Sequence, residues 1–187
     1  WRDGADCTMP DYTFSAPHKP QPQEQVTWPT DGVTLCYNAK TLEEAAEIFH
    51  TTVENLKELN PDCIGWIRFE NINISYPIMQ GEDNEYYLKH TLEGQAVTAA
   101  SIFMDANNHA DFSDQNTFIY GHNMKDKTMF GKLNDYKDEE FYKENPYFYI
   151  YTPDYTYRYD IFSCYLARVD NEVDFYTQFA SDEQFQE

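Results

Sequence analysis

The sequence has few basic residues. Its 187 residues include 13 Lys and Arg against 33 Asp and Glu, which gives a formal net charge of −20. This shortage excludes a protein that holds nucleic acid electrostatically, because a phosphate backbone is bound by clustered Lys and Arg. It also disfavours docking on anionic lipid, which attracts the same residues. A cationic partner would gain some attraction, although solubility alone is the simpler interpretation of the acidic balance.

Long apolar runs are missing as well. No run approaches the ~18 residues that a membrane-spanning helix needs, and no series of charged, apolar and small residues marks a secretion signal. The first residue is Trp1 rather than Met. We therefore expect an excised piece of a longer protein, in which any membrane contact is made only through a segment that this chain does not contain.

Motifs for metals, cofactors and common hydrolases are also absent. There is no GxSxG, HExxH, P-loop or GxGxxG motif, and the five histidines share no ligand-like spacing. The cysteines stand too far apart for CxxC redox or zinc-ribbon patterns. We predict no metal and no cofactor. We interpret the four cysteines as free thiols, with a disulfide of Cys7 or Cys36 as the alternative. These cysteines are Cys7, Cys36, Cys63 and Cys164.

One acidic segment partly matches a calcium loop. Oxygen-bearing side chains fall at alternate positions from Asp105 to Asp111, but Ala110 stands where such a loop requires Gly and Asn116 where it requires Glu. We interpret residues Asp105, Asn107, His109 and Asp111 as a solvated acidic turn. Facing carboxylates, as in a glycosidase, remain an alternative that no spacing supports.

Proline, then helical periodicity, organise the first third of the chain. Pro10, Pro17, Pro20, Pro22 and Pro29 predict an extended spacer over residues 1–30. Residues 31–62 predict a helical hairpin, because residues 41–60 carry two apolar stripes, each preceded by a capping signal. The spacing of this hairpin resembles the first part of a LysM module, a small glycan-binding fold. A hairpin that only packs on the next domain is the alternative.

Aromatic residues dominate the rest. The chain has 16 Tyr and 13 Phe, residues that favour pleated, half-buried surfaces. From residue 63 to 187, short apolar runs alternate with a few helical stretches, without the regular βαβ order of a Rossmann sheet. We predict a mostly β fold, an antiparallel barrel or sandwich with short helices. The expected strands cover 64–69, 73–79, 101–104, 116–121, 147–152 and 156–167, and the expected helices 83–90, 128–136 and 138–144.

Among the histidines only His122 has a telling position, because it follows the apolar strand NTFIY and one glycine. The block YGHNMKDKTMFG around it, with NPDCIGWIRF, ISYPIMQGEDNEYYLKH, SIFMD and YDIFSCY, resembles the class B sortases over about 125 residues. That family comprises membrane-anchored cysteine transpeptidases of Gram-positive bacteria with an eight-stranded β-barrel.

The resemblance implies a chemistry and a site. The catalytic histidine of the family falls on His122, and Asn84 and Leu88 fall on positions that border the substrate groove. A cysteine thiolate would attack a sorting signal, His122 would protonate the departing amine, and an amine of peptidoglycan or a pilin would complete the transfer. The partners implied are surface proteins that bear sorting signals, and the location is the extracellular face of the membrane or the cell wall.

The family's T-L-S-T-C nucleophile strand does not occur in this sequence, and Cys164 is interpreted as a buried core thiol. Ser181 with Gln184 begins a capped helix about one turn before the last residue. We therefore expect a barrel truncated at its C-terminal end, inactive as it stands although its parent is an enzyme. The alternative function is a non-catalytic glycan-binding protein with a degenerate sortase scaffold.

Overall fold

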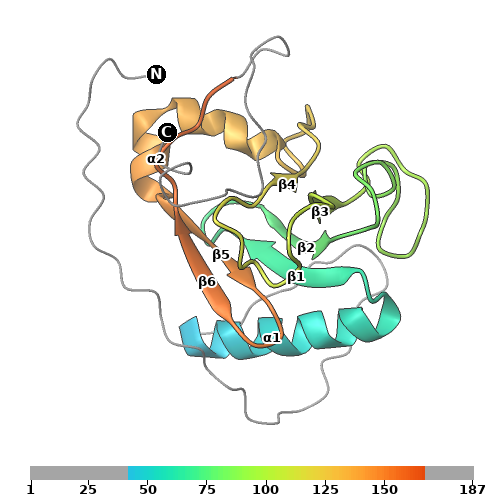
Figure 1. Cartoon of the computed structure of the whole chain (residues 1–187). Coiled ribbons are helices and arrows are strands. Elements are labelled where there is room, and N and C mark those ends of the chain that lie inside the picture. Colours follow the sequence, from blue (N-terminus) through green and yellow to red (C-terminus); the bar gives the residue numbers. More distant parts are fainter. Residues whose placement is uncertain (1–41, 167–187) are drawn as a thin grey trace.

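A six-stranded sheet forms the centre of the part of the chain that the structure, a computed structural model, describes, which is residues 42–166 (Figure 1). The elements in chain order are α1 (Leu42–Leu59), β1 (Cys63–Arg68), β2 (Ser75–Met79), β3 (Ile102–Met104), β4 (Ile119–Tyr120), the 3-10 helix η1 (Gly131–Lys137), α2 (Glu139–Glu144), β5 (Tyr147–Tyr151) and β6 (Thr156–Asp160). The Pro-rich spacer, Cys7, Cys36 and the helix predicted near Asp182 lie outside the described residues.

The strands follow the order β4-β3-β2-β1-β5-β6. All neighbours are antiparallel except β2 and β3, which run parallel with Ile78 opposite Ile102. Parallel strands need a long crossover, and residues 80–101 supply it. Figure 1 shows this connection as the loops at one end of the molecule, opposite α2. The mostly β architecture with short helices is confirmed.

The first helix packs on one face of the sheet, against β1 and β5 (Figure 1). Phe49 and Val53 are fully buried, and the Phe49 ring stacks on Tyr151 of β5 with ring centroids 4.4 Å apart. These side chains join Trp66 of β1 in one core cluster beneath the sheet. Burial of this apolar stripe, more than helix propensity, holds α1 in place.

The predicted helical hairpin is wrong in the described residues, because α1 is one continuous helix of 18 residues. Thr52, expected to begin a second helix, lies inside α1 and donates its hydroxyl hydrogen bond to the Ile48 carbonyl, 2.6 Å away. That bond satisfies the threonine within the helix. Phe49 and Val53 also lie on one face, four residues apart, so the two stripes are one.

Two other predicted elements differ from the structure. Residues 83–90 form turns, not a helix, with Tyr87 buried but Leu88 exposed. The strand expected over 156–167 ends at Asp160, paired with Tyr147, the first residue of β5. Beyond that pair Pro146 accepts one bond from the Ile161 N–H and has no N–H to return, so the ladder stops.

The second face of the sheet carries its own core. Ile64 and Ile67 of β1 pack there with Ile78, Ile102 and Ile150 from the neighbouring strands. Strand β1 is therefore buried on both faces, which explains its continuous apolar run. Among the described residues no helix is both long and apolar enough to cross a membrane.

Replacing Phe49 with alanine tests the packing of α1 on the sheet. We expect Phe49→Ala to lower the free energy of unfolding by about 3–5 kcal/mol, because a buried aromatic leaves a cavity. The matched variant Leu59→Ala, on the same helix but 73% exposed, should change it by less than about 0.5 kcal/mol. Urea denaturation followed by circular dichroism measures both. Equal effects would contradict the packing of α1 on the sheet.

Candidate active site

His122 lies where β4 ends and is half-buried. The preceding residue must be small, because a Cβ on Gly121 would lie 2.4 Å from the Ile102 side chain and 2.6 Å from the Phe130 ring. Both distances are shorter than van der Waals contact, so only glycine lets the chain pass between these side chains. Gly121 thus lets the backbone run close to the core, and the half-buried imidazole of His122 lies just beyond the end of β4.

A backbone carbonyl holds the imidazole. Nε2 of His122 lies 2.8 Å from the carbonyl oxygen of Leu88, in the crossover between β2 and β3. A carbonyl only accepts hydrogen bonds, so Nε2 carries the proton and donates it. Within residues 42–166 no side chain or backbone group bonds Nδ1. Among the described residues the imidazole is thus held through Nε2 alone.

The loop after His122 is anchored on η1. The His122 carbonyl accepts from the N–H of Phe130, Asn123 bridges to Met129, and the Asn134 side chain donates to Oδ1 of Asn123 at 2.6 Å. These bonds close residues 123–129 into a hairpin on the first turns of η1. The backbone on the C-terminal side of His122 is thereby fixed.

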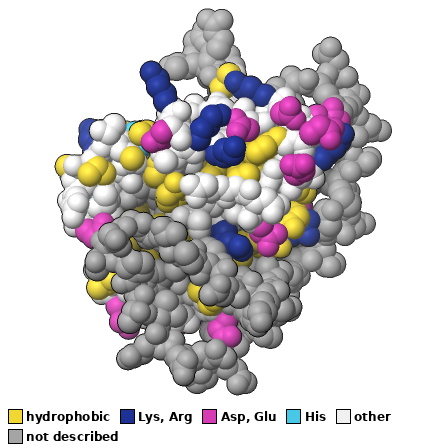
Figure 2. Space-filling view, turned by 180° about the vertical axis from the view of Figure 1, so that it is seen from behind, with side chains coloured by type: hydrophobic (Ala, Val, Ile, Leu, Met, Phe, Trp, Pro, Cys, Tyr) yellow, Lys and Arg dark blue, Asp and Glu magenta, His cyan; other side chains and the backbone are white. Residues whose placement is uncertain are grey.

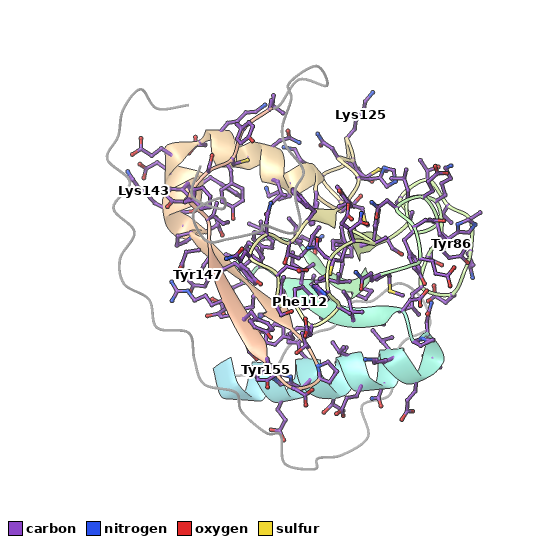
Figure 3. All side chains as sticks on the ribbon, viewed as in Figure 1. Tyr86, Phe112, Lys125, Lys143, Tyr147 and Tyr155 are labelled. Carbon is purple, nitrogen blue, oxygen red and sulfur yellow. The ribbon has the colours of Figure 1, made fainter. Side chains whose placement is uncertain are left out.

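Close packing and charge reinforce this anchor. A Cβ on Gly131 would lie 2.2 Å from the carbonyl oxygen of Met124, so the loop and η1 touch through backbone. Lys127 and Lys132 both pair with Asp135 of η1. Lys125, in contrast, points away from the body of the molecule (Figure 3). The loop thus has a fixed base and a charged, exposed tip.

Leu88 and Asn84 relate to His122 in different ways. Leu88 contacts it through the backbone, and its side chain is 39% exposed. Asn84 is engaged at both ends of its carboxamide: Nδ2 donates to Asp105 Oδ2 at 2.8 Å, and Oδ1 accepts from the Ala106 N–H at 2.8 Å. The structure therefore brings Leu88 and His122 together and ties Asn84 to the end of β3. Their roles toward a substrate stay predictions.

Asp105 is the centre of a polar cluster beside the site. It is 6% exposed, and its carboxylate accepts four hydrogen bonds, from Asn84, from Tyr120 and twice from Asn107. Burial by itself raises the pKa of a carboxyl group, but the bonds from Asn107, Tyr120 and Asn84 outweigh it and lower the pKa of Asp105 below its usual value. Asp105 is therefore an anion at neutral pH.

The interpretation of residues 105–111 as a solvated acidic turn is wrong for its first residue. Asp105 is buried because its four donors replace water. His109 and Asp111 are exposed, as expected. His109 pairs through Nδ1 with Asp114 at 2.6 Å, and this hydrogen bond raises the pKa of His109. Within the described residues no three His, Cys, Asp or Glu side chains are grouped to hold a metal.

A hollow of about 630 Å³ opens beside the anchored loop, lined by Asn123, Phe130, Leu133, Asn134, Lys137 and Cys164 among others. Cys164 is half-buried rather than a core residue, because β6 has already ended, and its Sγ lies 3.7 Å from the Leu133 carbonyl.

Figure 2 shows the described part of the rear face, where acidic and basic side chains alternate with apolar ones. The described acidic side chains on this face thus lie among basic ones rather than apart from them.

Sequence reasoning missed two parts of this site. The Leu88 carbonyl left no signal, because every residue carries a carbonyl. Asp105 and Tyr120 did leave a signal, since Asp105 directly follows the apolar strand β3, Tyr120 ends the apolar strand β4, and the two strands are neighbours in the sheet. Polar residues at neighbouring strand ends are candidates for a shared hydrogen bond.

The sequence matches known proteins over most of its length. The sortase domain family model matches residues 67–185. The chain is 38% identical over 138 residues to sortase B of Listeria monocytogenes and 33% identical over 135 residues to sortase B of Staphylococcus aureus, each covering 72% of this chain. It spans 54% of the length of these two relatives, about half.

Solved structures agree. The Clostridium perfringens sortase B structure superposes with a TM-score of 0.65 at 37% identity, covering 70% of this chain and 71% of that one. The Staphylococcus aureus sortase B–substrate complex gives a TM-score of 0.67 at 32% identity, covering 74% and 63%. Sheet, site and sequence thus point the same way, and the chain belongs to the sortase family, within class B.

Proposed function

We propose that the parent protein of this chain is a cysteine transpeptidase that acts at the cell surface of a Gram-positive bacterium. It cleaves a C-terminal sorting signal and joins the released protein to an amine of the cell wall or of a pilin. The observation that carries the proposal is the histidine at the end of β4, held as the Nε2–H tautomer by the Leu88 carbonyl. Membership of the sortase family supplies the reaction class.

The chemistry is acyl transfer through a thioester. A cysteine thiolate attacks the carbonyl carbon at the cleavage site, the C–N bond breaks, and the departing amine takes a proton from an imidazolium. An acceptor amine then attacks the thioester, forms a new amide and releases the thiolate. His122 gives the proton in the first half and takes one back in the second.

The Leu88 carbonyl suits such a histidine in both charge states. It accepts the Nε2 proton whether the ring is neutral or positively charged, so the proton on Nδ1 can leave and return without any turn of the ring. A carboxylate on Nε2 would instead strongly favour the charged form. The carbonyl fixes the orientation of the ring but favours its charged form less strongly than a carboxylate would. This suits a histidine that must both donate and accept a proton.

The glycan-binding alternative rested on the missing nucleophile motif and on a LysM-like hairpin of two helices that would hold the glycan. In the structure residues 42–59 form one helix whose apolar face packs on the sheet. The described residues therefore give this alternative no support, and the transpeptidase hypothesis is the one we retain.

Removing the imidazole tests the proposal. In the full-length gene product, His122→Ala should reduce cleavage of sorting-signal peptides by about 10²–10⁴-fold, the usual contribution of an acid–base group. The control is His109→Ala, which removes an exposed histidine paired with Asp114. Peptides copied from C-terminal sorting signals of the same organism, read by mass spectrometry, provide the assay. An inactive wild type, or equal rates for wild type and His122→Ala, would sink the proposal.

The two described thiols should behave as bystanders. Burial raises the pKa of the fully buried Cys63 thiol to about 12, so the thiol stays protonated, and thus unreactive, at neutral pH. Iodoacetamide at pH 8 should leave Cys63 unmodified until the protein unfolds, as peptide mapping would show. Cys164→Ser should leave cleavage unchanged. Rapid labelling of folded Cys63 would contradict its burial, and loss of activity in Cys164→Ser would make that thiol the nucleophile.

A further inference from the structure

We propose that Asp105 is a positioning residue for His122: its buried carboxylate fixes the distance between the two chain segments that hold the imidazole. One segment is the crossover that carries the Leu88 carbonyl, and the other is β4, which ends just before His122. The importance of this role for catalysis rests on the proposed function, whereas its effect on the imidazole does not.

The first segment is tied down at Asn84. Its Nδ2 donates to Oδ2 of Asp105, and its Oδ1 accepts from the next backbone N–H, at Ala106. Leu88 lies only four positions after Asn84, and the Asp83 carboxylate caps the turn between them by accepting from the N–H groups of Glu85 and Tyr86. A displacement of Asn84 is therefore passed on to the Leu88 carbonyl.

The second segment is tied to the same oxygen. The Tyr120 hydroxyl donates to Oδ2 of Asp105 at 2.7 Å, and Tyr120 precedes His122 by two residues. Burial and then the Asp105 carboxylate raise the pKa of Tyr120, so its hydroxyl keeps the proton that it donates. Oδ2 of Asp105 thus bonds both segments: the crossover, which carries the Leu88 carbonyl that accepts from His122, and β4, which leads to His122 itself.

The other carboxylate oxygen fixes Asp105 itself. Oδ1 accepts from the backbone N–H and the side-chain amide of Asn107, both at 2.9 Å, and the Gln80 side chain donates to the Asp105 carbonyl at 2.9 Å. With both oxygens fully used, an amide cannot replace the carboxylate. It would bring an NH₂ group, which only donates, against donors that need an acceptor.

The chain offers a matched control in Asp114. Its side chain is 5% exposed, and it likewise accepts several hydrogen bonds, from the Asn108 amide and from both the N–H and the ring of His109. These bonds stay within the segment 108–114. Asp114→Asn therefore removes a comparable buried carboxylate without touching Asn84 or Tyr120.

The test compares Asp105→Asn with Asp114→Asn in two measurements on the full-length gene product. The first is the imidazole tautomer of His122, read from its nitrogen chemical shifts by NMR at a pH at which the ring is neutral. Wild type and Asp114→Asn should show the Nε2–H form, and Asp105→Asn a mixture with the Nδ1–H form. A purely structural loss of stability would not select between tautomers in a protein that remains folded.

The second measurement is peptide cleavage. Asp105→Asn should lower kcat by about 10–100-fold, the cost of a misplaced catalytic group, while Asp114→Asn keeps the wild-type kcat. If Asp105→Asn does not fold, Tyr120→Phe, which removes one hydroxyl, should show a smaller shift in the same direction. A wild-type tautomer in the folded variants, or the same change in Asp114→Asn, would overturn the proposal. Failure of wild type to cleave peptides would count against the proposed function only.

Discussion

The parallel pairing of β2 with β3 is the constraint on which the site depends. Antiparallel neighbours can be joined by a tight turn, but a parallel pair forces the chain to return along the sheet before the next strand begins. Here the return is the crossover over residues 80–101, and it passes the end of β4. The carbonyl that orients His122 is thus supplied by the topology of the sheet, at a residue whose side chain stays free for other contacts.

Two kinds of interaction then hold the crossover and the sheet together. Apolar burial on both faces of β1 holds the sheet together and packs α1 on it, but apolar contacts do not impose a particular orientation on a side chain. Direction comes from the polar cluster around Asp105, where one anion satisfies four donors in a place with little water. Such a cluster is stable only when complete, because each orphaned donor would carry its full desolvation cost. The two together give the imidazole one orientation.

The sequence predicted much of the fold and named three candidate site residues, His122, Asn84 and Leu88, whose roles stay predictions. Strands β1, β2, β3 and β5 follow from apolar runs, since their side chains are buried or half-buried. The hairpin at residues 41–60 was wrong because local capping signals were weighed without knowing which face the sheet would bury. The helix at 83–90 was wrong because these residues form turns, the first of them capped by the Asp83 carboxylate. His122 drew attention through its strand and glycine, but only the resemblance to class B sortases implied a catalytic role for it. Its acceptor could not be predicted, because backbone carbonyls carry no sequence signal and the pairing of β2 with β3 is non-local.

In the proposed reaction, His122 is the proton donor of an acyl transfer that passes through a thioester. Intact-protein mass spectrometry of the full-length gene product, mixed with a sorting-signal peptide and no acceptor amine, tests this most directly. We predict an adduct equal in mass to the N-terminal part of the peptide, which disappears when an amine is added and does not form in His122→Ala. Cleavage of the peptide without any adduct, or an adduct that forms equally well without the imidazole, would contradict the account.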